Sequence, residues 1–131
     1  MQLLAGQRQI MPVGQLPHDV AQHLNCHPAV VYLRREEALN ISVKHREIQE
    51  YEIQFLPVLI EHGMYVWNKK RPKTVTAFYP EPLENKLFLA AMKVADSGSE
   101  VWVSTLYRTN PGYMNQVVRA HGILRPMTKL H

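Results

Sequence analysis

The spacing of apolar residues along the chain changes at Gly63. The composition of 34–63 predicts helix, and within it the apolar residues of 48–60 recur three and four positions apart, which predicts one apolar face. Pro57 interrupts this stretch, so we expect a kink or a break into two helices near Phe55. Gly63 suits a left-handed C-cap at the end of the segment. The apolar face consists of Ile48, Tyr51, Phe55, Leu56, Leu59 and Ile60.

Beyond Gly63, four short runs are rich in Val, Phe, Tyr, Trp and Thr, and turn residues separate them. These runs are 64–67, 74–79, 87–95 and 101–108. Their composition predicts strands, and the lengths of the separators favour antiparallel neighbours. Strands that follow helices are typical of an α+β fold. We therefore expect a helical layer packed on a four-stranded antiparallel sheet.

The rest of the chain predicts shorter elements. Residues 1–16 show no clear periodicity, so we expect a flexible N-terminal arm or linker there, followed by a single domain over 17–131. Within that domain, 17–25 predicts a short helix with proline in its first turn. Residues 28–33 predict a strand, and 113–122 predict a final short helix.

Polar residues occupy positions in the last two strands where a small protein normally places its core. Strict alternation along 101–108 puts Thr105 and Tyr107 on one face and Arg108 on the other. In the preceding strand, Lys93 interrupts a face that is otherwise apolar. A lysine at such a position must reach water, pair with a carboxylate, or face a cleft that an anionic ligand fills.

Composition and charge narrow the function classes. The chain has 131 residues, and its 15 basic and 11 acidic residues give a net charge of +4, which favours a polyanionic partner without requiring one. No segment approaches the ~18 apolar residues of a membrane span, and we expect neither a span nor a signal peptide. The densest basic cluster predicts a turn between strands that either contacts phosphate or is simply solvated. It consists of Lys69, Lys70, Arg71 and Lys73.

A group of metal-ligating residue types lies near the N-terminus, at His18, His23, Cys26 and His27. His23 and His27 are four positions apart and could share a helix face, which would allow a zinc site. Pro28 closes the segment, however, and the spacing matches no standard structural or catalytic zinc motif. We therefore expect no metal. The single cysteine also gives no reason to expect an oxidising compartment.

Three segments, taken in order, carry a resemblance to a known family. They are a helical segment with a histidine (ISVKHREIQEYEIQFLPVLIEHG), a strand with an inward lysine (FLAAMKV) and a strand ending in EVWVSTLYR. Residues 30–109 thereby resemble the BECR nuclease superfamily, which embraces barnase, EndoU, certain colicins and RelE. The likeness is closest to its phage-associated and polymorphic-toxin branches. It implies a metal-independent endoribonuclease without a cofactor, which cleaves RNA by attack of the 2′-hydroxyl and leaves a 2′,3′-cyclic phosphate.

The resemblance also implies which residues act on the substrate. His45 matches the histidine of the helical segment and is the candidate general base or acid. Lys93 would stabilise phosphate charge, and Thr105 would donate a hydrogen bond to a phosphoryl oxygen. Tyr107 would stack a base or donate a proton. His62, near the end of the same helical segment, competes with His45 for its role.

Four further basic residues are candidates for substrate binding. Arg46 and Arg108 would add positive charge around the phosphate, and Lys70 and Arg71 would contact phosphate from the basic turn. Arg46 follows His45 directly, so in a helix their side chains point about 100° apart, and only one of them can face the sheet.

The resemblance implies RNA as the partner, with tRNA favoured, and a toxin of the kind used in contact-dependent inhibition or by phage. Such a toxin acts in the cytoplasm of a target cell, delivered alone or within a larger effector, and a cognate immunity protein or antitoxin would cover its basic cleft. We expect a monomer that does not engage a membrane. Two other functions stay open: a non-catalytic nucleic-acid-binding module, and a phage structural or interaction domain in which Lys93 pairs with a glutamate.

Overall fold

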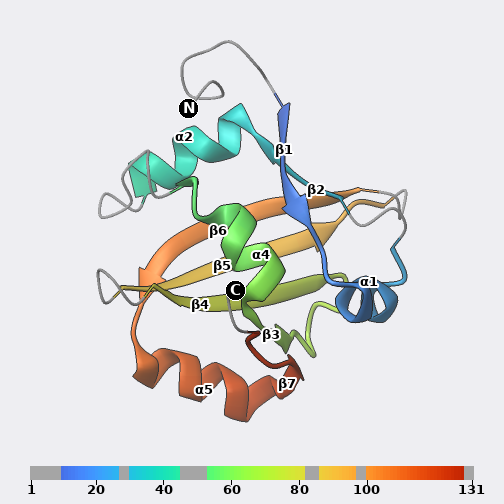
Figure 1. The fold of residues 1–131 in the computed structure, drawn as a ribbon, viewed down its shortest axis with the longest axis vertical. Helices are drawn as coiled ribbons and strands as arrows, with labels where there is room; N and C mark the ends of the chain where they lie inside the picture. Colours follow the sequence, from blue (N-terminus) through green and yellow to red (C-terminus); the bar gives the residue numbers. More distant parts are fainter. Residues whose placement is uncertain (1–9, 27–29, 45–52, 82–85, 97–99, 129–131) are drawn as a thin grey trace.

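The protein is built on one sheet of seven strands, on which four helices pack (Figure 1). The computed structural model describes residues 10–26, 30–44, 53–81, 86–96 and 100–128, and the numbers of strands and helices refer to this part of the chain. The strands are β1 (Ile10–Gln15), β2 (Val30–Arg34), β3 (Met64–Trp67), β4 (Thr74–Glu81), β5 (Lys86–Val94), β6 (Val101–Thr109) and β7 (Ile123–Arg125). The helices are α1 (His18–Leu24), α2 (Arg35–Lys44), α4 (Leu56–His62) and α5 (Pro111–His121). The strand order is β1-β2-β6-β5-β4-β3-β7.

The expected four-stranded antiparallel sheet is wrong, because the sheet is mixed and has seven strands among the described residues. The four predicted strands, β3 to β6, do lie antiparallel to one another. β2, however, lies parallel to β6, β1 pairs with β2, and β7 pairs with β3. Parallel partners need a long crossover connection, so their pairing leaves no mark on the local sequence pattern. β7, with three residues, is too short to show alternation.

β1 replaces part of the expected flexible arm, since Ile10–Gln15 form an edge strand paired with β2. Residues 1–9 lie outside the described part of the chain. Pro12 hides the strand from sequence analysis, but an edge strand tolerates a proline because its outer side needs no N–H donor. The close approach of α4 accounts for Gly14, where a Cβ would lie 3.2 Å from the side chain of Ile60.

Two helix ends follow the local chemistry that the sequence predicts. α1 begins after Pro17, and Asn25 ends it with a φ of 53°, in the left-handed region that asparagine tolerates. α4 begins after Phe55 and carries Pro57 in its first turn, where the missing N–H costs nothing. A helix therefore starts at the predicted break. Residues 45–52, which precede it, lie outside the described part of the chain.

Gly63 follows α4, but it is not the left-handed cap that the sequence predicts. Its φ of −65° and ψ of 160° are those of extended backbone. A Cβ at this position would lie 2.5 Å from the carbonyl oxygen of Leu59 and 3.0 Å from that of Phe78. The close approach of α4 to β4, and not a turn of unusual handedness, requires glycine here.

The two faces of the sheet are covered unequally. α1, α2 and α4 pack on one face, where the larger apolar cluster joins them to alternate strand residues such as Phe88 and Leu106. α5 packs on the opposite face over a smaller cluster of Val66, Phe78 and Leu89, and none of its own residues is fully buried. In Figure 1, α4 crosses in front of the strands, whereas α5 lies at the lower end of the molecule. Part of the α5-side face is therefore left for polar residues.

Candidate functional site

A β-bulge at Ser104 decides which side chains of β6 share a face. Val103 lies opposite Met92 of β5, and Thr105 lies opposite Ala91, so Ser104 is the extra residue between them. One extra residue shifts the alternation of every residue that follows it. Val103 and the later Leu106 are accordingly both buried, although strict alternation puts them on opposite faces.

The bulge corrects the alternation expected from the sequence and brings three of the predicted residues onto one face. Thr105 and Tyr107 do not share a face with the buried valines of β6; they lie on the α5 side of the sheet. Lys93 lies opposite Trp102 on that same side, and its side chain is exposed. Lys93, Thr105 and Tyr107 occupy successive rows of this face, about 7 Å apart along the strands. Thr105 is in the middle row.

Thr105 and Tyr107 line a hollow of about 200 Å³ between the sheet and α5. Tyr113 and His121 of α5 and Thr76 of β4 contribute to its walls. Burial and a hydrogen bond with Tyr113 raise the pKa of Tyr107 to about 12. The Tyr107 phenol therefore keeps its proton at neutral pH and acts as a donor. This polar hollow is here called the threonine hollow.

His121 is a residue of the threonine hollow that sequence reasoning missed. It lies in the last turn of α5, and its Nδ1 accepts a hydrogen bond from the backbone N–H of Lys69, at 3.3 Å. A neutral imidazole whose Nδ1 accepts must carry its proton on Nε2. His121 thus offers a second donor. Its only sequence signal is its place at the end of a predicted helix, which says nothing about its distance from β6.

The basic turn between β3 and β4 adjoins His121 through this contact with Lys69. Asn68 shapes the turn, because its side-chain oxygen accepts from the backbone N–H groups of Lys70, at 3.1 Å, and Arg71, at 3.0 Å. The side chains of these three basic residues are exposed. Lys73, at the end of the turn, lies 3.5 Å from the carboxylate of Asp96. The predicted substrate-binding residues Lys70 and Arg71 therefore stand at the border of the threonine hollow.

Lys93 lines a second hollow on the same face, with a volume of about 330 Å³. Arg34 of β2, Glu37 of α2, and Trp102 and Ser104 of β6 also line it. The sheet face thus carries two neighbouring hollows, with Thr105 in one and Lys93 in the other. The second is here called the tryptophan hollow.

The remaining predicted residues do not join this face. Arg108 lies opposite Phe88, so the strand register puts it on the side of α2 and α4. His45 and Arg46 lie outside the described residues. Of the predicted set, the structure brings together Lys93, Thr105 and Tyr107 on one face, with Lys70 and Arg71 at its border.

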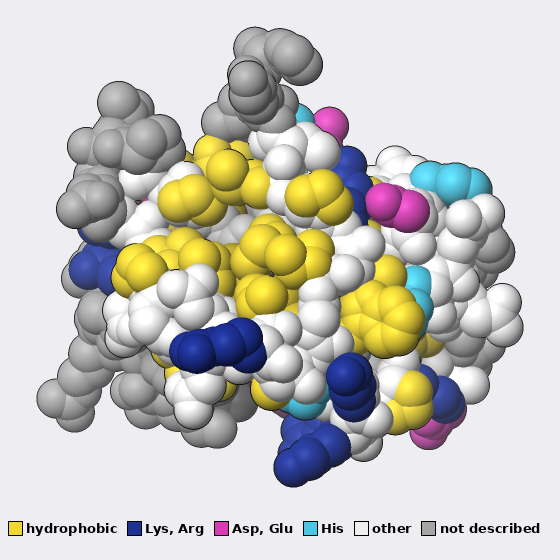
Figure 2. All heavy atoms as spheres, turned by 90° about the horizontal axis from the view of Figure 1, so that it is seen from below, with side chains coloured by type: hydrophobic (Ala, Val, Ile, Leu, Met, Phe, Trp, Pro, Cys, Tyr) yellow, Lys and Arg dark blue, Asp and Glu magenta, His cyan; other side chains and the backbone are white. Residues whose placement is uncertain are grey.

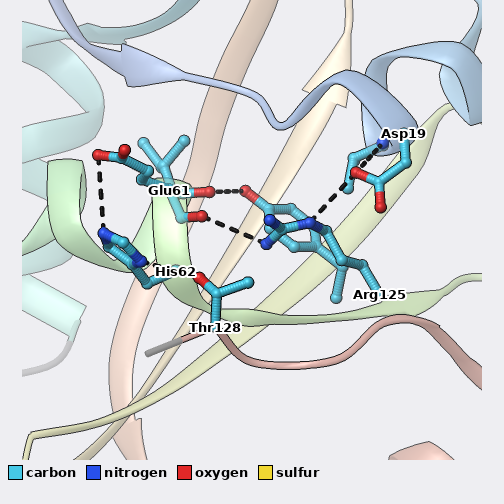
Figure 3. Close-up of polar contacts among 8 residues, drawn as sticks. Asp19, Glu61, His62, Arg125 and Thr128 are labelled. Carbon is cyan, nitrogen blue, oxygen red and sulfur yellow. Dashed lines mark hydrogen bonds and ion pairs between the residues drawn. The ribbon is translucent and has the colours of Figure 1, made fainter. Parts of the chain in front are cut away.

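A separate polar cluster ties α1, α4 and the C-terminal segment together (Figure 3). Arg125 pairs with the Asp19 carboxylate, at 3.2 Å, and donates to the backbone carbonyl of Glu61, at 3.3 Å. His62, the competing histidine, has its Nδ1 2.8 Å from the Thr128 hydroxyl oxygen and belongs to this cluster, not to the threonine hollow. A cleft of about 670 Å³ lies beside it, lined in part by Asp19, Glu61 and Arg125. The ion pair and hydrogen bonds of these residues hold α1, α4 and the C-terminal segment together.

The group of metal-ligating residue types near the N-terminus is dispersed. The His23 ring packs against Trp67, with 4.5 Å between the ring centres. Cys26 is buried, and burial raises the pKa of its thiol. His27 lies outside the described residues. Within the described ranges, no group of three or more His, Cys, Asp or Glu residues could hold a metal ion.

The side of the molecule that carries α5 and β7 exposes several large apolar side chains. Figure 2, a view from below Figure 1, shows hydrophobic side chains gathered over the middle of this side, with Lys and Arg side chains along its lower border. The large apolar side chains exposed on α5, β7 and the neighbouring segments are Tyr113, Ile123, Met127 and Trp67. A further hollow of about 470 Å³, lined by Met64, Phe78 and Met114, adjoins α5. None of the helices in the described ranges has the length and apolar character needed to cross a membrane.

Comparison with known proteins finds no match to this chain among protein families, curated proteins or solved structures.

Proposed function

We propose that this protein binds RNA on the α5-side face of its sheet and cleaves it as a metal-independent endoribonuclease. The proposal rests on the β-bulge at Ser104, because the bulge puts Thr105 and Tyr107 on the same face of the sheet as Lys93. A cation and two hydroxyl donors in successive rows suit a substrate whose backbone carries regularly spaced phosphates. The basic turn at the border adds positive charge for the same backbone.

The proposed cleavage mechanism follows from the order of Lys93, Thr105 and Tyr107 along this face of the sheet. The scissile phosphate lies over Thr105, which donates a hydrogen bond to a non-bridging oxygen, while Lys93 reaches the same phosphate from one side. Tyr107, on the other side, holds its proton because its pKa is raised to about 12, and it protonates the departing 5′-oxygen. The 2′-oxygen forms a bond to phosphorus as the bond to the 5′-oxygen breaks. A base removes the 2′-hydroxyl proton, and for this step the resemblance implies His45, which lies outside the described residues.

The reaction yields a 2′,3′-cyclic phosphate and a free 5′-hydroxyl, and it consumes neither water nor metal in this step. The resemblance of 30–109 to BECR nucleases supplies the reaction class. The proposal does not depend on the four-stranded sheet that the resemblance also implied, because every residue it uses on β5 and β6 is defined by the observed register.

Cleavage of total tRNA in the presence of EDTA tests the proposal. Thr105→Val removes one donor at nearly constant volume and should slow cleavage about 10²- to 10³-fold. Tyr107→Phe and His45→Ala should each slow it about 10²-fold or more, because each removes a proton-transfer group. Lys93→Gln should also slow cleavage. The product ends should be cyclic phosphates.

Matched controls separate chemistry from folding. His18→Ala removes an exposed histidine on α1, far from β5 and β6 in the chain, and should leave the rate within about twofold of the wild type. Circular dichroism should show the same thermal transition in every variant that is assayed. The proposal fails if the wild-type protein leaves RNA intact, or if Thr105→Val and Tyr107→Phe both cleave at the wild-type rate.

One observation favours a second candidate, an RNA-binding module without catalysis. Nδ1 of His121 already accepts the backbone N–H of Lys69, and Tyr107 keeps its proton because its pKa is raised to about 12, so neither atom is a free base in the threonine hollow. Such a module would retain labelled RNA intact in a gel-shift assay. Its affinity would fall with salt, and Lys70→Ala or Arg71→Ala would each reduce the slope of log K against log salt by about 0.7, the value for one contact with a single strand.

A further inference from the structure

Trp102, which lines the tryptophan hollow, belongs to an aromatic pair on the open part of the sheet face. Trp102 of β6 lies beside Tyr32 of the parallel strand β2, with 5.4 Å between the ring centres and 39° between the ring planes. Both rings are half-buried, and neither belongs to the two apolar clusters of the fold. Aromatic side chains of this size normally fill a core. Here one of the two, Trp102, lines a surface hollow together with the exposed Lys93.

A guanidinium group already lies over the indole. The central carbon of the Arg34 guanidinium is 4.1 Å from the centre of the Trp102 ring. Arg34 is itself an exposed residue. The indole N–H donates to the Glu100 carboxylate at 3.2 Å, which fixes the plane of the ring. The result is an indole ring of defined orientation with a guanidinium group over its face.

The polar groups around this indole ring argue against a simple anion site. Arg34 and Lys93 supply two cations, but Glu37 lines the same hollow, and Glu100 lies at its edge. Two carboxylates beside two cations leave little net attraction for a free phosphate ion. A ligand that gains most of its affinity from a flat ring, with a phosphate at its margin, fits both the aromatic surface and this mixed charge. The hollow's 330 Å³ lies within the range of small-molecule sites.

We propose that the tryptophan hollow binds one unpaired nucleobase of the RNA strand that crosses the threonine hollow. The base stacks against Trp102 and the Arg34 guanidinium that lies over it, and Lys93 holds the phosphate between the two hollows. This inference rests on the proposed function and makes it specific: the substrate is single-stranded at this point. Unpaired bases stack on aromatic rings and on guanidinium planes, whereas a duplex keeps its bases inside.

The sequence offers a direct optical test, because the chain contains only two tryptophans. Trp67 packs against His23 of α1 and also lines the threonine hollow, so its fluorescence would respond to the same strand, and Trp67→Phe leaves Trp102 as the sole reporter. The probe is a short 2′-O-methyl oligouridylate, which has no free 2′-hydroxyl and is not cleaved. Its addition to Trp67→Phe should quench Trp102 fluorescence to saturation. The same strand paired with its complement should leave the fluorescence of Trp67→Phe unchanged.

Binding measured by anisotropy of the labelled oligonucleotide gives the energetic test. Trp102→Ala should weaken binding between about 5-fold and 100-fold, the effect of losing one stacked base, whereas Trp102→Phe should retain most of the affinity. Thermal unfolding checks that Trp102→Ala is folded, and Trp102→Phe keeps the test valid if it is not.

The outcomes separate this inference from the proposed function. Quenching of Trp102 without RNA cleavage by the wild-type protein supports the stacking site and overturns catalysis. Cleavage with no response from Trp102, and with normal activity in Trp102→Ala, overturns the stacking site and leaves catalysis standing. Absence of any binding of the probe, or equal quenching by the single strand and the duplex, also overturns it.

Discussion

Deletion of Ser104 should leave the fold and the orientation of β6 intact. Ser104 is the extra residue of a bulge, with Val103 opposite Met92 and Thr105 opposite Ala91. Without it, Val103 and Thr105 become neighbours in the chain and keep these partners, so each later residue stays on its present face. We expect the free energy of unfolding to change by no more than about 1 kcal/mol, since no buried side chain moves.

A regular strand would respond very differently to the same deletion, because every residue after 103 would turn to the other face. Leu106, which is 1% exposed, would leave the core, at a cost of about 2–5 kcal/mol by analogy with truncation of a buried leucine. The Thr105 hydroxyl would enter the core at a cost of about 1–3 kcal/mol. The sum, roughly 3–8 kcal/mol, is a large part of the ~5–15 kcal/mol that stabilises a typical domain.

Urea unfolding followed by circular dichroism distinguishes the two cases. The matched control is deletion of Ala91, which lies opposite the bulge but belongs to a strand in regular pairing with β4. That deletion reverses the first half of β5 and expels Phe88, so the variant should be largely unfolded without urea. A loss of several kcal/mol on deletion of Ser104 would refute the bulge and, with it, the shared face of Lys93 and Thr105.

Three other predictions test particular parts of the fold. Phe88→Ala, at a fully buried position, should lower the free energy of unfolding by about 3–5 kcal/mol in the same urea assay, and a loss below about 1 kcal/mol would contradict the larger cluster. Gly63→Ala should lower the free energy of unfolding by about 1–3 kcal/mol, because its Cβ would meet the Leu59 carbonyl oxygen at 2.5 Å. The control Gly112→Ala, on α5, should change it by less than about 1 kcal/mol. Equal effects of the two substitutions would argue against the close approach at Gly63. The pKa of Tyr107 is raised from 10.0 to about 12, so the folded state binds the phenol proton more tightly than the unfolded state does. The stability that this proton contributes is complete below pH 10 and is lost as the pH rises through about 12. The wild-type free energy of unfolding should therefore fall more steeply than that of Tyr107→Phe over this pH range, and parallel curves would show that Tyr107 is not perturbed.

Most of the elements between 64 and 121 were predictable from the sequence, because each depends on a pattern within a few residues. β3 coincides with the predicted run 64–67, and α4 starts where Pro57 allows a helix to begin. β1 and β7 were not predictable in the same way. A proline at a sheet edge and a strand of three residues leave no alternation to detect.

The residues of the candidate site likewise divide into those that the sequence predicted and those that it did not. The sequence picked out Lys93 by its position on an otherwise apolar face, and the structure puts that side chain at an exposed row. It did not find His121 or Arg34, because their distances to β6 depend on how α5 and β2 pack. His45 and Arg46 lie outside the described residues, so their part in the site stays a prediction.

The sequence by itself determined where helices and strands form and which side chains in β5 break the apolar pattern, since these properties depend on neighbours along the chain. The tertiary structure alone decided the width of the sheet, the parallel pairing of β2 with β6, and the face on which Thr105 and Tyr107 lie. Strict alternation assumes one residue per position, and only the pairing with β5 reveals the extra residue at Ser104. A single unpaired residue, visible only in register with its partner strand, therefore decides which side chains can meet a substrate together.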